Sequence, residues 1–136
     1  MGVRGQVSVE LLVVMAAFFA FLVAWLPVVL NVGSAASADV AARYAQLAAT
    51  DIQKSAEEVA LLGPGNSKQL EIVLQADTEF GFESEAIRLV YSDDSGRRVV
   101  ERPSSRSIEF EFAELQKGRH SLLIESAGNE VRVRKA

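Results

Sequence analysis

The segment Arg4-Gly5-Gln6-Val7-Ser8-Val9-Glu10 is followed directly by the longest apolar stretch of the chain. From Leu11 to Ala38 no residue carries a charged side chain. Since about 20 apolar residues suffice for a helix to cross a bilayer, this run can span a membrane or serve as a buried helix in an assembly. Glu10 is unusual there, because a carboxylate drawn into a membrane costs up to about 2.5–3.5 kcal/mol on insertion scales, and less near a helix end.

The motif at the start of this run resembles that of a known family. Gln6, Ser8 and Glu10 in the order Q-x-S-x-E, after a leader ending Arg4-Gly5, are similar to the class III signal peptides of archaeal type IV pilin-like proteins. The resemblance implies that a membrane prepilin peptidase cuts between Gly5 and Gln6 and leaves the apolar helix on the mature chain. It also implies that Glu10 pairs with the new Gln6 amine of an adjacent subunit during filament assembly. Beyond these positions the resemblance rests on layout alone: a long N-terminal helix, then a small β-rich head.

Composition limits the remaining classes of function. The 136 residues leave room for one modest folded domain beside the helix. The net charge is −4 and no basic stripe appears, which makes nucleic acid an unexpected partner. Cysteine is absent, so disulfides and thiolate metal sites are excluded. No N-x-S/T sequence is present for N-glycosylation.

The sequence predicts four segments: a cleaved leader (1–5), a transmembrane or filament-core helix (6–33), an amphipathic spine helix (34–62) and a β head (66–136). Within the helices, Pro27 removes a backbone donor and Gly33 adds a second weak point, so a kink or loosened zone is expected between them. The spine has an apolar side at helical spacing, formed by Val40, Tyr44, Leu47, Ala48, Ile52, Val59 and Leu62. Gly63-Pro64-Gly65-Asn66 is expected to end it.

Alternating apolar and polar residues after Ser67 predict five or six short antiparallel strands, packed on the spine or folded into a small sandwich. The fold class is therefore α+β. The apolar positions of these strands are Leu70, Ile72, Leu74, Ala76, Ile87, Leu89, Tyr91, Ile108, Phe110, Phe112, Leu122, Ile124, Val131 and Val133. The expected breaks are Asp77–Ser84, Ser92–Gly96, Pro103–Arg106, Glu114–Gly118 and Ala127–Asn129. Asp93-Asp94-Ser95-Gly96 and Ala127-Gly128-Asn129 resemble hairpin turns.

No catalytic, metal or cofactor site is predicted. His120 is the only histidine, and with no cysteine no nucleophile–base arrangement can be built. A metal at His120 would need carboxylates such as Glu109, Glu111 or Glu125 to align across strands, so a plain strand residue is favoured.

Two charged clusters near the centre of the head sequence are interpreted as parts of a turn and a hairpin rather than as binding sites. Asp93 and Asp94 are interpreted as turn residues rather than calcium ligands. The arginines at 97, 98, 102 and 106 alternate with acids and are typical of a solvated hairpin.

The favoured function is a structural one, in which the head lies outside the cell and the N-terminus is cytoplasmic until an assembly machine adds the subunit to an extracellular filament. The expected partners are copies of itself or related pilins, the prepilin-type peptidase, the membrane and the assembly machinery. A minor pilin, a pseudopilin or a single-span surface protein fits the same sequence. A conventional secreted protein, cut after Ala36-Ser37-Ala38 to begin at Asp39, is disfavoured because the apolar run exceeds the usual 7–15 residues of a signal core and because of Glu10.

Overall fold

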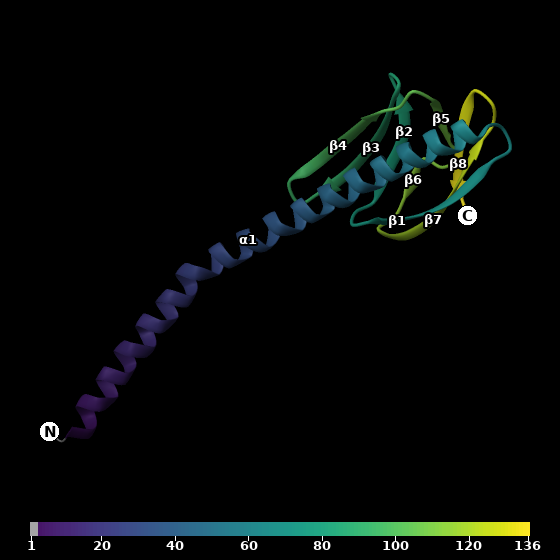
Figure 1. Cartoon of the computed structure of the whole chain (residues 1–136). Coiled ribbons are helices and arrows are strands. Elements are labelled where there is room, and N and C mark those ends of the chain that lie inside the picture. The colour runs from purple at the N-terminus through teal and green to yellow at the C-terminus, as the bar shows by residue number, and fades with distance from the viewer. Residues whose placement is uncertain (1–2) are drawn as a thin grey trace. The chain divides into compact units, whose positions relative to one another are not determined.

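The computed structural model describes the backbone of residues 3–136 and the side chains of residues 8–33 and 35–136. The chain is an α+β protein: a long helix, α1 (Val3–Leu62), is followed by strands that form a head of two small sheets (Figure 1). By their contacts the residues form two compact units, residues 1–37 and residues 38–136. The predicted spine from Ala38 onward therefore belongs to the same unit as the β head.

The helix differs from the prediction at its start and in its middle. It begins at Val3 rather than at Gln6, because in the uncut chain the residues before Gln6 supply carbonyls for another helical turn. It also continues through Pro27 and Gly33 as one helix. One proline removes a single backbone bond while the bonds on either side persist, so the helix extends past it. Whether the helix bends there stays a prediction.

As predicted from the sequence, α1 ends at Leu62, directly before Gly63. Gly63 has a φ of +92°, a left-handed conformation that glycine adopts without steric cost, and its N–H donates to the Ala60 carbonyl at 3.3 Å. The Asn66 side chain then donates to the carbonyls of Leu62 (2.8 Å) and Gly63 (3.1 Å). These bonds satisfy carbonyls that the last turn leaves without helical partners.

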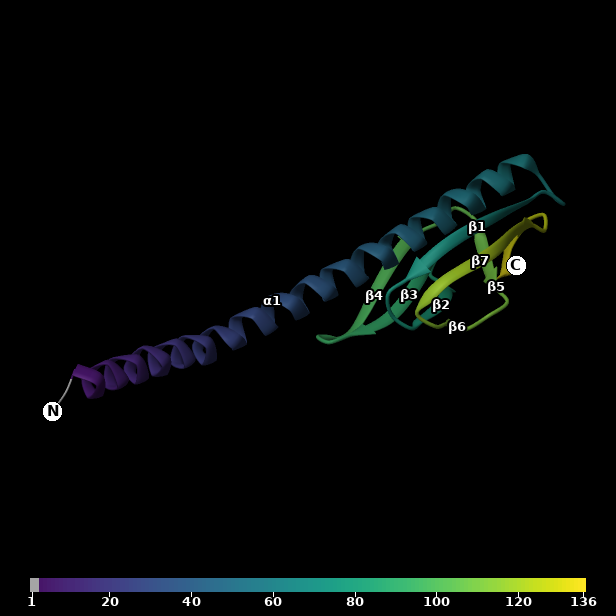
Figure 2. The same cartoon turned by 90° about the horizontal axis from the view of Figure 1, so that it is seen from below.

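The head contains two four-stranded sheets. Their orders are β1-β7-β8-β5 and β4-β3-β2-β6. Figure 2 gives a second view of these strands and of the part of α1 beside them. The strands are β1 (Ser67–Leu74), β2 (Thr78–Glu83), β3 (Ala86–Asp93), β4 (Gly96–Pro103), β5 (Ser107–Phe110), β6 (Glu114–Leu115), β7 (Gly118–Ser126) and β8 (Glu130–Lys135).

The sequence correctly predicted short strands after Ser67, but it predicted too few of them. Both expected hairpins are confirmed: Asp93 pairs with Gly96 across the β3–β4 turn, and β7 turns back into β8 around Gly128. The predicted break at Asp77–Ser84 is wrong, because Thr78, Phe80 and Phe82 alternate with polar residues or glycine and form β2. The predicted break at Glu114–Gly118 contains the two-residue β6. One pair, β5 with β8, is parallel rather than antiparallel.

A single core joins the helix to both sheets. Fully buried Ile52 and Val59 of α1 lie in one cluster with Leu74 of β1, Leu89 of β3 and Val133 of β8. Small residues dominate the helix's contribution to this core and to the adjoining cluster around Tyr91: Ala41, Ala45, Ala48, Ala49 and Ala56. A face of alanines lets strands approach the helix closely while losing little side-chain entropy.

The apolar side predicted for the spine is only partly the buried side. Ala48, Ile52 and Val59 are buried as predicted. The large residues Val40, Tyr44, Leu47 and Leu62 are exposed by 37–64%. The buried stripe is rotated toward the alanines, because both stripes have helical spacing and only the packing of the sheets selects between them.

Ile52 should be a main contributor to head stability. Ile52→Ala removes a side chain with no exposed surface and leaves a cavity, so the free energy of unfolding should fall by about 2–5 kcal/mol. Leu61→Ala is the matched control, since Leu61 is 85% exposed and its loss should change stability by less than about 0.5 kcal/mol. Urea unfolding of the full chain in detergent, followed by circular dichroism, measures both; equal effects would contradict this core assignment.

Candidate functional site

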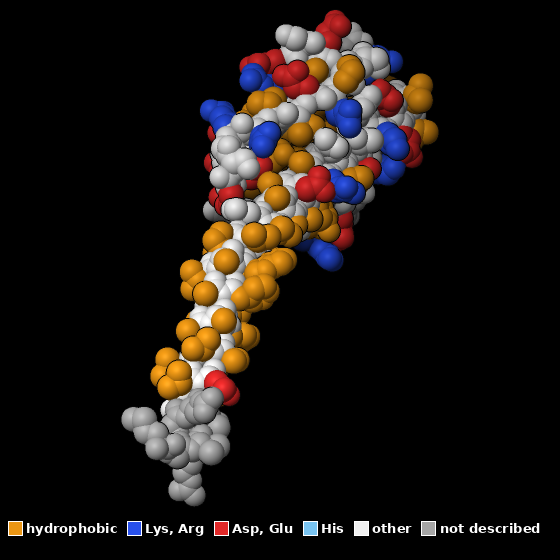
Figure 3. Space-filling view, turned by 90° about the vertical axis from the view of Figure 1, so that its left-hand side faces the viewer, with side chains coloured by type: hydrophobic (Ala, Val, Ile, Leu, Met, Phe, Trp, Pro, Cys, Tyr) orange, Lys and Arg blue, Asp and Glu red, His pale blue; other side chains and the backbone are white. Residues whose placement is uncertain are grey.

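The N-terminal part of α1 presents an exposed apolar surface. Every described side chain from Ser8 to Gly33 is exposed, including Leu12 at 69% and Val23 at 71%. Figure 3 shows hydrophobic side chains along the visible face of this segment and charged side chains gathered on the head. By length and composition α1 contains one segment capable of crossing a membrane. An apolar surface of this extent needs lipid or other protein to cover it.

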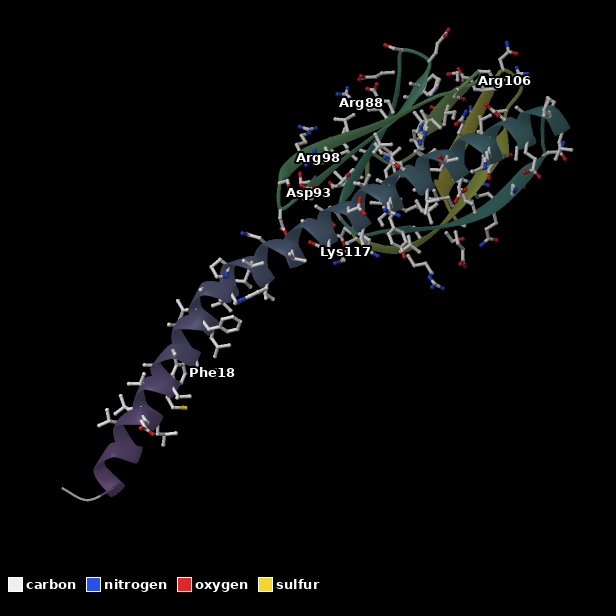
Figure 4. The ribbon with its side chains drawn as sticks, turned by 60° about the vertical axis from the view of Figure 1, so that its left-hand side comes forward. Phe18, Arg88, Asp93, Arg98, Arg106 and Lys117 are labelled. Carbon is white, nitrogen blue, oxygen red and sulfur yellow. The ribbon has the colours of Figure 1, made fainter. Side chains whose placement is uncertain are left out.

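The aromatic residues of this segment form pairs along the helix. The Phe18 and Phe19 rings lie 6.2 Å apart, and those of Phe21 and Trp25 lie 5.8 Å apart at the helical spacing of four residues. Figure 4 shows Phe18 pointing away from the helix axis. These side chains are exposed and so are available both to lipid and to helices of other molecules.

The predicted processing motif lies at the start of the helix. The Gly5–Gln6 peptide bond is within α1, whereas the side chains of Arg4 and Gln6 lie outside the described residues. Ser8 and Glu10 are exposed. None of the salt bridges among the described side chains involves Glu10, so its carboxylate is available to an external cation.

Comparison with known protein families, with characterised proteins and with solved structures finds no match to this chain. The motif and the fold are therefore the observations from which a function must be argued.

The other residues considered in the sequence lie apart on the head. His120 is on β7, where its Nε2 donates to the Gln116 carbonyl at 2.6 Å. Glu109 and Glu125 each pair with an arginine of β8, Arg132 at 3.2 Å and Arg134 at 3.6 Å. Among the described side chains no group of three metal-ligating residues comes together.

Two of the three arginines of β4 form ion pairs, one of them with the largely buried Asp93 carboxylate. Arg97 contacts Glu79 at 2.9 Å, and Arg98 contacts Asp93 at 3.5 Å, the latter pair labelled in Figure 4. In the turn itself, the Asp93 carboxylate accepts from the Ser95 N–H at 2.7 Å, which is the Asx geometry expected of a turn. Arg102 is different, since no salt bridge among the described residues includes it.

The sequence analysis missed a groove beside the spine. It has a volume of about 310 Å³ and is lined by Arg43, Gln46, Leu47, Thr50 and Arg102. Four of these residues come from α1 and one from β4, so no sequence window contains them. The only local signal was the spacing of Arg43, Leu47 and Thr50, which puts them on one helix face.

Tyr91 sits where the spine begins to contact the strands. It is 4% exposed, packs with Ala41 and Ala45, and borders a second cavity of about 230 Å³ next to Asp93 and Arg98. Burial raises the pKa of the Tyr91 hydroxyl above its usual 10.0, and the nearby Asp93 carboxylate acts in the same direction, while Arg98 opposes it.

This shift makes head stability sensitive to alkaline pH. Above about pH 10 the unfolded tyrosine loses its proton while the folded one keeps it, so the free energy of unfolding should fall as pH rises toward the folded pKa. Tyr91→Phe should remove much of that decline, whereas Tyr44→Phe, at a residue exposed by 37%, serves as the control. Denaturation midpoints measured between pH 9 and 11.5 test this; an unchanged slope in Tyr91→Phe would contradict it.

Proposed function

We propose that the chain is a type IV pilin-like structural subunit. A prepilin peptidase cuts before Gln6, the apolar helix holds the subunit in the membrane, and the subunit is then assembled into an extracellular filament. The observation that carries the proposal is the Q-x-S-x-E motif placed directly before a helix whose apolar surface is exposed on all sides.

An apolar helix of this kind suits two successive environments. In the membrane its side chains contact lipid, and in a filament core the same side chains contact neighbouring helices. Because hydrocarbon and apolar side chains are similar solvents, the transfer requires little change in burial energy. The described side chains from Ser8 to Gly33 are all exposed and so remain available for either environment.

In this assembly Glu10 sets the axial position of each subunit relative to its neighbour. A carboxylate at the edge of an apolar core is costly unless it is paired, and cleavage creates a positively charged amine at Gln6 one helical turn away in sequence. In a filament the pair forms between adjacent subunits, so a subunit at the wrong height leaves an unpaired buried charge. The helix N-terminus further favours a negative charge at this position.

The secreted-protein alternative has one structural observation in its favour. The head unit begins at Ala38, so a cut after Ala38 removes the apolar helix and keeps Ala41 and the rest of the core. A single-span surface protein or minor pilin would instead keep the helix in the membrane. The mature N-terminus separates these possibilities.

The proposal is tested by mass spectrometry of the mature N-terminus in membrane and surface-filament fractions. A start at Gln6 is the expected result. A start at Asp39 would indicate a secreted head, and an intact Met1 would indicate an unprocessed membrane protein; either would overturn the pilin proposal. A start at Gln6 with the protein found only in membranes would favour a minor or non-filament component.

The pairing role predicts the behaviour of Glu10→Gln. This change keeps the size of the side chain but removes its charge, so cleavage should proceed while incorporation into filaments falls at least about tenfold. Asp51→Asn, which removes an exposed charge on the head part of α1, should leave incorporation unchanged. Immunoblots comparing membrane and filament fractions measure both, and normal filaments from Glu10→Gln cells would rule out the pairing.

A further inference from the structure

We propose that the spine groove of one head binds the acidic β2–β3 turn of a second copy of the chain. The spine groove is the cavity lined by Arg43, Gln46, Leu47, Thr50 and Arg102. The inference rests on the proposed function, because it names the head-to-head contact of the filament that the apolar helices build.

The groove contains a guanidinium group, that of Arg102, which forms no ion pair with any described residue. Arg102 lies on β4 opposite Ile87, a residue with no exposed surface, and its Nε is buried without a hydrogen-bond acceptor. The other cation of the groove, Arg43, pairs with Asp39 at 2.9 Å. No carboxylate lines the groove. A partly buried arginine that lacks an acceptor is an unfavourable arrangement, and a carboxylate entering from outside would relieve it.

The groove also adjoins an apolar surface. Leu47 in its lining is 58% exposed, and Val40 and Tyr44 precede it at helical spacing with exposures of 43% and 37%. Exposed large side chains on one helix face next to an unpaired cation favour a protein partner that brings both a carboxylate and side-chain contact area. A small inorganic anion would leave the apolar part uncovered.

The β2–β3 turn supplies the complementary chemistry. Ser84 and Glu85 form its tip with φ values of +53° and +60°, a left-handed conformation that is uncommon for residues other than glycine. The Ser104 N–H donates to the Glu85 carbonyl at 2.9 Å and so fixes this turn from the β4–β5 connection. Figure 1 shows the β2–β3 turn projecting beyond the neighbouring strands of the head.

Glu85 is the free charge on this turn. Its side chain is exposed and takes part in none of the ion pairs among the described residues, while the adjacent Glu83 pairs with Arg88 at 2.8 Å. The small Ser84 beside it keeps the tip narrow. A rigid, narrow turn with one free carboxylate matches a cavity with one free guanidinium, since little ordering entropy is lost when they dock.

A second copy of the chain is the partner for the spine groove that would also link subunits into a filament. Within one head Glu85 and Arg102 do not form an ion pair, although Ala86 lies opposite Pro103 across β3 and β4. A contact between a groove on one subunit and a turn on the next uses two different surfaces. Such heterologous contacts repeat from subunit to subunit, and they produce a helical filament when the rotation does not close into a ring.

The first test is a charge exchange in the full chain, with surface filaments measured by electron microscopy and immunoblotting. Arg102→Glu and Glu85→Arg should each lower filament yield at least about tenfold, because each places like charges at the contact. The double variant restores the opposite pair and should recover yield to within about threefold of the unmodified chain. The controls are Arg119→Glu and Glu111→Arg, exposed residues outside the groove and turn, which should have no effect.

The second test remains decisive if Arg102→Glu disturbs folding. The natural chain has no cysteine, so Thr50→Cys in the groove and Ser84→Cys on the turn introduce the only thiols. Oxidation of filaments carrying both should give a ladder of cross-linked multimers, whereas either single variant should give at most dimers. The absence of a ladder would overturn the inference.

The outcomes also separate this inference from the proposed function. Filaments that begin at Gln6, depend on Glu10 and show neither charge-exchange rescue nor a cross-linked ladder would refute the groove contact and keep the pilin proposal. Loss of filaments in both single variants without rescue, together with capture of an unrelated acidic protein by the groove, would assign the groove to a different partner. A chain that never forms filaments would overturn both.

Discussion

The structure depends on the large apolar surface that the described side chains of α1 expose from Val9 to Val32. Burying apolar surface is the main favourable term in folding and association, at about 25 cal/mol for each Å² removed from water. A helix that leaves so much of it exposed cannot persist alone in water. This part of the helix therefore requires lipid or other protein around it.

In the head, the C-terminal part of the same helix packs against the strands. From Ala41 to Val59 the buried side of α1 consists mainly of alanine, with Ile52 and Val59 as the larger contributors. Because alanine projects little from the helix, strands from both sheets reach Ile52 and form one core with it. The larger residues Val40, Tyr44 and Leu47 consequently lie outside this core, where they are available for contact with another molecule.

Some charged groups of the head form ion pairs with one another, and others do not. Most arginines of the strands have carboxylate neighbours, in exposed pairs that contribute little to stability. Arg102 and Glu85 have no ion pair among the described residues and have opposite signs, one in a groove and the other on a fixed turn. Glu10, at the other end of the chain, is a third group with no ion pair among the described side chains. Residues of this kind are candidates for specific contacts with another molecule.

The sequence by itself determined the features that depend on neighbouring residues. The helix stop at Gly63, the turns at Asp93–Gly96 and Ala127–Asn129, the buried strand residues Leu122 and Val133, and the membrane-compatible run follow from local conformation and periodicity. The motif around Glu10 was likewise recognised from the sequence, and the structure adds no ion pair to Glu10 among the described side chains. Tertiary structure decided which stripe of the spine is buried, that β5 pairs in parallel with β8, and that Arg102 joins Leu47 in one groove. These features depend on which distant segments pack together, and that choice is made by the fit of whole sheets against the helix rather than by any short stretch of residues.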